Sequence, residues 1–229
     1  MIDFRSNRPR AGAPLTASLS ERLRLETRAL HVQTERSGAM ADLLAGRLDR
    51  AGFTALLRNL HAIYLALEQA LEHHAAAHWL APLPWRDLQR APALAEDLGV
   101  LHGPGWRDDL PLQPATAGYV EKLQGLDAAD PPTLVAHAYV RYLGDLHGGQ
   151  VLRRLIASQL GLDGEAGTRF YDFGDEPRVL ELRRALRAGL AALPLDAAAQ
   201  QRVVAEAQWA FMQHQRLFEQ LRAADPASV

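Results

Sequence analysis

Apolar residues recur along most of this chain at the spacing of helices. The longest regular run follows Asp49, the expected N-cap, and comprises Phe53, Leu56, Leu57, Leu60, Ile63, Tyr64, Leu67 and Leu71. Steps of three and four residues place these side chains on one face of an α-helix. No stretch of useful length alternates apolar and polar residues as a strand does, and no internal repeat is present. The pattern predicts an all-α protein of about seven to nine helices.

Residues that favour helix ends mark the expected boundaries. Ser18 and Glu21 form an S-x-x-E capping box, which predicts a first helix that continues to about residue 37. Gly38 interrupts this helix, and two further turns are expected to end with Gly46 in the C-cap position. Further helices are predicted at about 92–101, 114–124, 131–160, 176–192 and 197–223.

Length and composition limit the classes of protein that remain. The chain has 229 residues, which suits one domain, and we expect a disordered arm over 1–17 before a domain over 18–229. The net charge of −2 gives no reason to expect nucleic acid as a partner. The sequence contains no cysteine, which excludes disulfides and thiolate metal sites and fits a cytoplasmic protein. No run reaches the ~20 apolar residues of a membrane span, so we expect no membrane anchor.

The stretch YVRYLGDLHGGQVL, from Tyr139 to Leu152, is unusual for a helix. Each of its three glycines costs a helix interior about 0.5–1 kcal/mol relative to alanine. Asp145 lies three and four residues before Gly148 and Gly149 and shares their face of the helix. Such a face suits a flat ligand on bare backbone, but small residues also allow two helices to pack closely. The spacing favours neither explanation, although the adjacent glycine pair favours a kink.

One histidine and two arginines are candidates for binding a ligand. His31 precedes Glu35 by one turn, so the carboxylate can hold the ring as the partners of metal-bound histidines do. Such i, i+4 pairs more often lie on a helix surface without binding a ligand. Arg183 and Arg187 lie on one face and suit a carboxylate, although an ordinary solvated face is the more common explanation of such a pair.

Most of the nine histidines have no pattern that indicates chemistry. His61 and His137 are expected to be satisfied core or surface residues of long helices. His214, on the last helix, faces a partner that the sequence does not define. Four others lie near helix ends or in connections and are expected on the surface: His73, His74, His78 and His102.

Several segments together resemble the haem oxygenase family. AHAYVRYLGDLHGGQVL resembles its distal-helix signature, and RALHVQTE its proximal-histidine helix. LHAIYLALEQALE and RVVAEAQWAFMQHQRLFEQL are similar to two further helices, so the resemblance covers about residues 18–222 in order. It implies a single-domain helical bundle in which haem lies between a proximal helix and a kinked distal helix. It also implies cleavage of haem b, both cofactor and substrate, to biliverdin, carbon monoxide and ferrous iron.

The resemblance assigns residues to the two sides of the haem. His31 matches the axial ligand of the haem iron, and Glu35 matches its acidic neighbour. Gly144 and Gly148 match glycines whose backbone lies against the haem face, and Gly149 adds the flexible joint. O2 is the expected co-substrate. Electrons are expected from a separate protein, a ferredoxin, a flavodoxin or an NADPH-dependent reductase.

The resemblance also implies a polar network and a group of haem-propionate contacts. Asp145 matches the aspartate that organises ordered water beside the oxygen-binding site, with Tyr64 and Arg141 in the same network. The residues expected near the propionates are Tyr139, Arg183, Arg187 and Arg24.

One departure and three alternatives accompany this interpretation. His147 stands where the family often has serine, and on a regular helix it lies about 200° from Asp145, so we expect it to point away.

A non-enzymatic haem carrier or sensor on the same fold is the main alternative. Thiamin-degrading relatives typically use a cysteine, and di-iron oxidases need clustered carboxylate and histidine ligands, neither of which the sequence offers.

Overall fold

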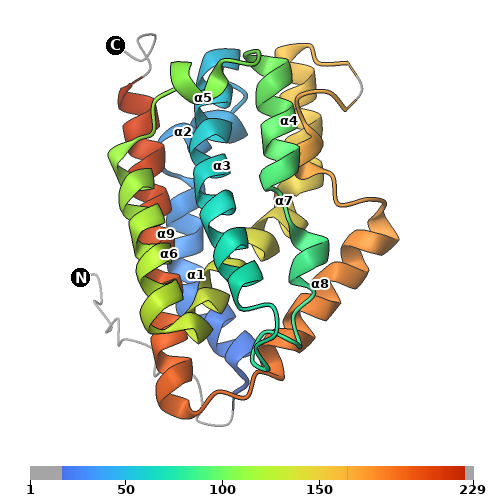
Figure 1. Ribbon diagram of the computed structural model, residues 1–229. Coiled ribbons are helices and arrows are strands. Elements are labelled where there is room, and N and C mark those ends of the chain that lie inside the picture. Colours follow the sequence, from blue (N-terminus) through green and yellow to red (C-terminus); the bar gives the residue numbers. More distant parts are fainter. Residues whose placement is uncertain (1–16, 164, 225–229) are drawn as a thin grey trace, which may run out of the picture.

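Helices make up the whole regular structure of the part of the chain that can be described. A computed structural model describes residues 17–163 and 165–224, and these contain no strand (Figure 1). The nine α-helices are α1 (Leu19–Glu35), α2 (Gly38–Leu44), α3 (Arg50–His73), α4 (Ala91–Leu101), α5 (Trp106–Asp109), α6 (Pro114–Ala129), α7 (Val135–Leu160), α8 (Glu176–Ala191) and α9 (Ala197–Ala223). Three 3₁₀ segments are η1 (Trp85–Leu88), η2 (Pro131–Leu134) and η3 (Arg169–Tyr171). The predicted all-α class is confirmed. The expected arm over 1–17 lies outside the described residues except for Ala17.

Side-chain caps fix the starts of α1, α3, α8 and α9. Ser18 and Glu21 form the predicted capping box at α1, with the Ser18 backbone N–H 2.9 Å from the Glu21 carboxylate. Asp49 accepts a hydrogen bond from the Gly52 backbone N–H at 2.7 Å and caps α3. Each such cap satisfies a backbone donor that has no partner within the helix and contributes about 1 kcal/mol. Local sequence signals therefore define where α1 and α3 begin.

The predicted helix over 131–160 begins differently from the expectation. Residues Pro131–Leu134 form the 3₁₀ segment η2, and the α-helix starts only at Val135. The first turn is closed by the Thr133 N–H, which donates to the Asp130 carbonyl at 3.0 Å. Figure 1 shows α7 running obliquely behind α3 and then turning upward behind α4. Gly161, at φ +59°, ends the helix.

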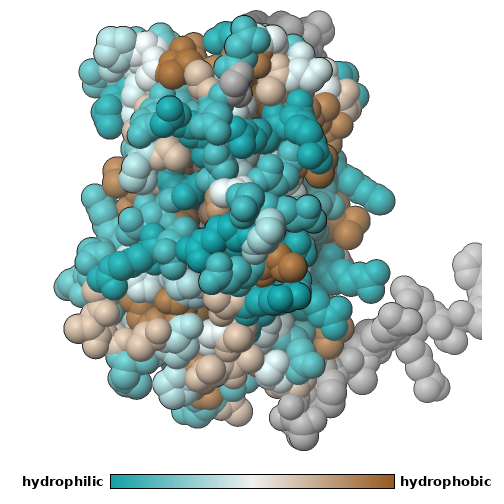
Figure 2. Space-filling model, turned by 90° about the vertical axis from the view of Figure 1, so that its right-hand side faces the viewer, coloured by the Kyte–Doolittle hydropathy of each residue, from teal (hydrophilic) through white to brown (hydrophobic). Residues whose placement is uncertain are grey.

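The helices enclose one apolar core and leave a polar outer surface. α1 packs along α9, while α3 packs between α4 and α6. Leu23, Phe53 and Phe218 are among the fully buried side chains. Figure 2 shows the side that carries α4 and α8, and this face is largely hydrophilic with scattered apolar residues. None of the described helices combines the length and the hydrophobicity that crossing a membrane requires.

His61 on α3, which the sequence predicts to be a satisfied core or surface histidine, is buried and only partly satisfied. It is 5 % exposed, packs edge-on against Trp106 with ring centroids 4.8 Å apart, and its Nδ1 has no hydrogen-bond partner among the described residues. Burial lowers the pKa of His61 from 6.5 to about 4. The folded chain therefore holds this ring neutral over a pH range in which the unfolded chain protonates it.

This difference predicts a pH dependence of stability. Because the pKa of His61 is depressed in the folded chain, its contribution to the free energy of unfolding is fully present above pH 6.5. This stability is lost as the pH falls towards 4, because protonation then favours the unfolded chain. His61→Gln should lower the slope of the unfolding free energy by up to about 1.4 kcal/mol per pH unit in that window. Urea titrations at several pH values measure the slope. His78→Gln, at an exposed position, is the control; an unchanged slope in His61→Gln would contradict the assignment.

Candidate functional site

A cavity opens between α1, α7 and α9. Its volume is about 380 Å³, and a second hollow of about 240 Å³ adjoins it because both are lined by His31, Gly144 and His147. The first hollow is mostly apolar, and its walls include Met40, Leu44, Leu56, Leu60, Val151, Leu152, Phe170 and Phe211. Together the two hollows have the size and lining of a site for a large, mostly apolar ligand.

The α7 glycines form one wall of this cavity and differ in what surrounds them. A Cβ at Gly144 would meet no atom within 4 Å, and one at Gly148 would only touch Leu152 Cδ1 at 3.9 Å. Both residues line the cavity. Gly149 instead lies against η3, where a Cβ would come 3.5 Å from the Tyr171 carbonyl oxygen. We therefore assign Gly144 and Gly148 to the bare wall and Gly149 to helix packing.

His31 lines both hollows from α1. Its side chain is 48 % exposed, and its Nδ1 lies 3.8 Å from Glu35 Oε2, which is ion-pair range but longer than a hydrogen bond. Phe211 of α9 packs against the ring at a centroid distance of 5.8 Å, nearly perpendicular to it. The ring is thus held on two sides and keeps an imidazole nitrogen available at the cavity.

Asp145 belongs to a buried cluster at the inner end of the cavity. Tyr64 donates a hydrogen bond to Asp145 Oδ2, while Arg141 donates to Tyr64 Oη at 3.2 Å and to Asp145 Oδ1 at 3.3 Å. Asp145 and Arg141 line the cavity, whereas Tyr64 is completely buried behind them. The structure therefore brings together these three residues, which the sequence places on two separate helices.

Burial dominates the electrostatics of this cluster. It raises the pKa of the Asp145 carboxyl above its ordinary value, against the opposing effects of Arg141 and of the Tyr64 hydrogen bond. Burial also raises the pKa of the Tyr64 hydroxyl, so that group stays protonated. Asp145 can consequently hold a proton at a higher pH than an exposed aspartate while Tyr64 and Arg141 fix its orientation.

The second hollow is cationic. Arg24, Arg28 and Arg187 line it together with Tyr139, whose hydroxyl lies 3.4 Å from Thr27 Oγ1. Within residues 17–163 and 165–224, none of the three arginines forms an ion pair with a carboxylate. This edge of the cavity suits a ligand with carboxylate groups.

Arg183 does not line either hollow, unlike Arg187 one turn later. Its Nε is buried and has no hydrogen-bond partner among the described residues. The i, i+4 spacing predicted a shared role for the two arginines. In the structure only Arg187 reaches the cavity wall.

His147 lines both hollows rather than pointing away from the site. Its Nδ1 donates to the Leu143 carbonyl at 2.6 Å, so Nε2 is left as the acceptor for Arg187, 2.8 Å away. At about 100° per residue, Asp145 lies about 100° to one side of Gly144 and His147 about 60° to the other. The expectation that His147 points away was wrong because it measured the angle from Asp145. The cavity is centred on Gly144 instead, and both residues flank it.

His214 is a cavity residue that the sequence left without a partner. It is 1 % exposed, and its Nδ1 donates to the Ala210 carbonyl at 2.8 Å. Its Nε2 is consequently an acceptor, and it has no partner among the described residues. Burial lowers the pKa of His214 to about 3, so the ring is neutral. Phe211, His214 and Phe218 are spaced by three and four residues and all line the cavity. This spacing on α9 could have indicated from the sequence that His214 shares a face with the two phenylalanines.

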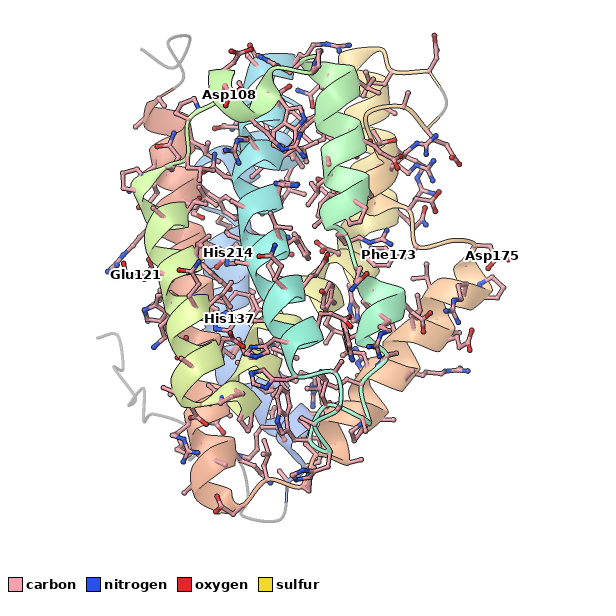
Figure 3. All side chains as sticks on the ribbon, viewed as in Figure 1. Asp108, Glu121, His137, Phe173, Asp175 and His214 are labelled. Atoms are coloured by element: carbon pink, nitrogen blue, oxygen red, sulfur yellow. The ribbon has the colours of Figure 1, made fainter. Side chains whose placement is uncertain are left out.

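His137 is buried inside the bundle like His214, and Figure 3 shows both there. Its Nδ1 lies 2.8 Å from the Tyr119 hydroxyl, and its Nε2 lies 3.3 Å from Glu206. Tyr119 in turn packs edge-on against His214 with centroids 5.2 Å apart. The sequence left open whether His137 is a satisfied core or a surface histidine. The structure buries it, but Nε2 makes no hydrogen bond with the described residues, so it is only partly satisfied.

Taken together, the residues of the cavity fit a large planar ligand with carboxylates on one edge. The bare wall at Gly144 leaves room for a flat face, and His31 offers a metal-binding nitrogen. The three arginines without a carboxylate partner among the described residues lie together in the second hollow. Haem has this combination of properties. The geometry thus agrees with the expectation from the sequence motifs.

Comparison with known proteins gives a consistent result. The family model for heme oxygenase matches residues 17–220. The chain is 36% identical over 218 residues to heme oxygenase 2 of Synechocystis, covering 93% of this chain and 86% of that protein. It is 36% identical over 206 residues to human heme oxygenase 1, covering 89% of this chain and 72% of that protein.

Solved structures agree with the sequence comparison. The crystal structure of heme oxygenase-2 from Synechocystis, in complex with heme and NO, superposes with a TM-score of 0.88 at 35% identity. That match covers 93% of this chain and 88% of the other. The structure of heme oxygenase from Leptospira interrogans gives a TM-score of 0.84 at 30% identity, covering 89% of this chain and 99% of the other. The chain therefore belongs to the haem oxygenase family.

Proposed function

We propose that this chain is an enzyme that cleaves haem to biliverdin, carbon monoxide and ferrous iron, using O2 and electrons from a separate protein. The observation that carries the proposal is the cavity in which His31, the bare backbone of Gly144 and the buried Asp145 meet. A haem carrier needs the first two features. The buried proton-holding cluster is what an enzyme needs in addition.

The proximal side of the site would be formed by α1. His31 would bind the haem iron, with Glu35 and Phe211 restraining its ring. When bound, haem supplies both the iron at which O2 reacts and the ring that is opened. Gly144 and Gly148 would keep the distal face clear, because any larger side chain on that wall would occupy the space needed there.

On the distal side, Asp145 would control the delivery of protons. Its raised pKa allows the carboxyl to hold a proton, and the hydrogen bonds from Tyr64 and Arg141 keep its oxygens in place. His214 lines the same cavity, and its Nε2, an acceptor without a partner among the described residues, would bind a water molecule there. Protons would then pass from Asp145 through ordered water rather than by direct contact.

The arginines would determine how the haem lies in the cavity. Arg24, Arg28 and Arg187 would bind the propionates at the cationic end, with Tyr139 beside them. Arg183 would contribute charge from behind this wall. Fixing the propionates fixes which edge of the ring faces Asp145, and positioning of this kind decides which bond reacts.

Filling the bare wall should weaken haem binding. Gly144→Leu adds a side chain that points into the cavity, and we expect the affinity for haemin to fall by at least about tenfold. Gly118→Leu on α6 is the matched control, because a Cβ there also meets no atom within 4 Å but the residue is exposed. Titration followed at the Soret band measures both. Equal affinities in the two variants would contradict the assigned wall.

Removing Arg187 should weaken binding only of haem that carries free carboxylates. Arg187→Ala is expected to reduce haemin affinity by about tenfold, the value of one charge-assisted hydrogen bond at a partly exposed site. The dimethyl ester of haemin should bind the variant and the parent chain equally. Arg184→Ala, an exposed neighbour that does not line the cavity, is the control. A similar loss with the ester would show that Arg187 acts by packing rather than by charge.

A single-turnover experiment tests the enzyme against the carrier. One equivalent of haemin is bound, and an electron donor is added under air. Loss of the Soret band with the appearance of biliverdin is the expected result, whereas a stable Soret band would establish the carrier.

The electron donor and the compartment follow from the sequence. It contains no recognised flavin, nucleotide or iron–sulfur motif, so a ferredoxin, flavodoxin or NADPH-dependent reductase would supply electrons. The lack of cysteine fits a reducing compartment such as the cytoplasm.

A further inference from the structure

We propose that the ends of α3 and α6 form a binding site for one divalent first-row transition metal ion, made by His73, His74 and Asp127. His73 is the last residue of α3, His74 is its C-cap, and Asp127 lies in the last turn of α6. Each residue offers one ligand atom, and the three atoms lie within 4.8 Å of one another. The haem cavity has no part in this proposal.

The distances suit one shared ion. His73 Nδ1 lies 3.1 Å from Asp127 Oδ1, and His74 Nε2 lies 2.8 Å from the same oxygen. Ligand atoms that all contact one ion at about 2.1 Å are about 3.0–3.4 Å apart in octahedral or tetrahedral geometry. Small rotations of exposed side chains are therefore enough to place all three around an ion, and water can complete the coordination.

The surroundings hold His74, one of the three ligands, in place. The His74 side chain is 20 % exposed, and its ring packs against Trp79 with centroids 5.8 Å apart. Its Nε2 is also 3.2 Å from the Asp127 backbone carbonyl, a further oxygen beside the proposed ion. His73 is 69 % exposed, so the site opens to solvent and an ion has a route of entry.

The Asp127 carboxylate is also unusual in its partners. Among the described residues it lies within ion-pair distance of the two imidazoles but of no lysine or arginine. Asp42 and Asp130, by contrast, are paired with Arg222 and Arg202. A carboxylate without a permanent cation, placed between two histidines, keeps its negative charge available for a metal ion.

The ligand types determine which ions the site would take. Two imidazoles with one carboxylate suit Zn²⁺, Fe²⁺, Cu²⁺ or Ni²⁺, whereas Mg²⁺ and Ca²⁺ prefer oxygen ligands alone. From Leu60, which lines the haem cavity, to His73 is about 20 Å along α3. An ion at this site would link the ends of α3 and α6 and stabilise their packing without taking part in chemistry on haem.

Binding of Zn²⁺ alone tests the site. Isothermal titration of untagged, metal-free and haem-free chain should show saturable binding that is weakened at least about tenfold in His73→Ala and in Asp127→Asn. Asp127→Asn is the sharper variant, because asparagine can still accept a hydrogen bond from histidine but is a poor metal ligand. His102→Ala is the control, since His102 pairs with Asp109 at 3.0 Å without a second histidine. His31 is present in the parent chain and in every variant, so any Zn²⁺ that it binds cancels when their affinities are compared.

A second measurement covers the possibility that a variant is destabilised. Zn²⁺ should raise the melting temperature of the parent chain and of His102→Ala, but not that of Asp127→Asn, while Mg²⁺ should change none of them. Circular dichroism checks that each variant keeps its helices. Equal Zn²⁺ affinity in the parent chain and Asp127→Asn, or no saturable binding, would show that the three residues form only hydrogen-bonded pairs and would overturn the proposal.

Discussion

Replacing Asp145 with alanine is expected to stop biliverdin formation while leaving haemin bound. The carboxyl lies in the cavity wall with a raised pKa and is held by Tyr64 and Arg141, so its loss removes a proton carrier without removing the haem ligand. General acid catalysis contributes about 10²–10⁴-fold to a rate. We therefore expect the rate of biliverdin formation in a single turnover to fall at least about 100-fold.

Two further variants separate this role from a general effect of a buried carboxylate. Asp145→Asn keeps the size of the side chain but cannot hold an exchangeable acidic proton, so it should fail like alanine. Glu68→Gln is the control, because Glu68 is also buried with a raised pKa but accepts hydrogen bonds from the backbone N–H groups of Arg90 and Ala91. It should lower stability and still yield biliverdin. Native turnover in Asp145→Asn would remove Asp145 from the proton path.

Replacing His31 with alanine is expected to abolish the axial histidine spectrum of bound haem and to stop turnover. Of the histidines that line the cavity, His31 lies on α1 beside Glu35, while the Nε2 of His147 is occupied by Arg187. Absorption and resonance Raman spectra of the haemin complex measure the loss. Added imidazole should enter the vacated space and restore the spectrum, which distinguishes a missing ligand from a damaged fold.

His147→Ala and His214→Ala are the matched controls for this experiment. Both rings line the cavity, and each carries its hydrogen on Nδ1, so each has an Nε2 of the kind that binds iron. We expect both variants to keep the axial spectrum of the parent chain. A spectrum that survives in His31→Ala and disappears in one of the other two would identify a different ligand.

The sequence predicted the helices well where local signals and burial agree. The apolar run of α3 and the caps at Ser18 and Asp49 are local features, and each gave the observed element. At Pro131 the first turn is a 3₁₀ segment, although α4, α6 and α8 begin as α-helices with proline in the same positions. The helix pattern in the sequence does not distinguish these outcomes. The short helix α5 and the segments η1 and η3 lie in stretches without a long periodic signal.

The candidate site was predictable only in part, because it depends on contacts between distant segments. The motif indicated a stripped helix face with one carboxylate, and the structure places Gly144, Gly148 and Asp145 at one cavity. Nothing in the motif shows that Gly149 lies against Tyr171 of η3. Likewise, the rotation of α8 that brings Arg187 but not Arg183 to the wall is set by packing.

A crystal structure of the chain with bound haemin tests the central claim most directly, because several histidines line the proposed cavity. We predict that the iron is bound by Nε2 of His31, that one haem face lies on the backbone of Gly144 and Gly148, and that the propionates point to Arg187. The Asp145 carboxyl should be on the side of the haem opposite His31. Iron bound by His147 or His214, or haem bound outside this cavity, would contradict the account.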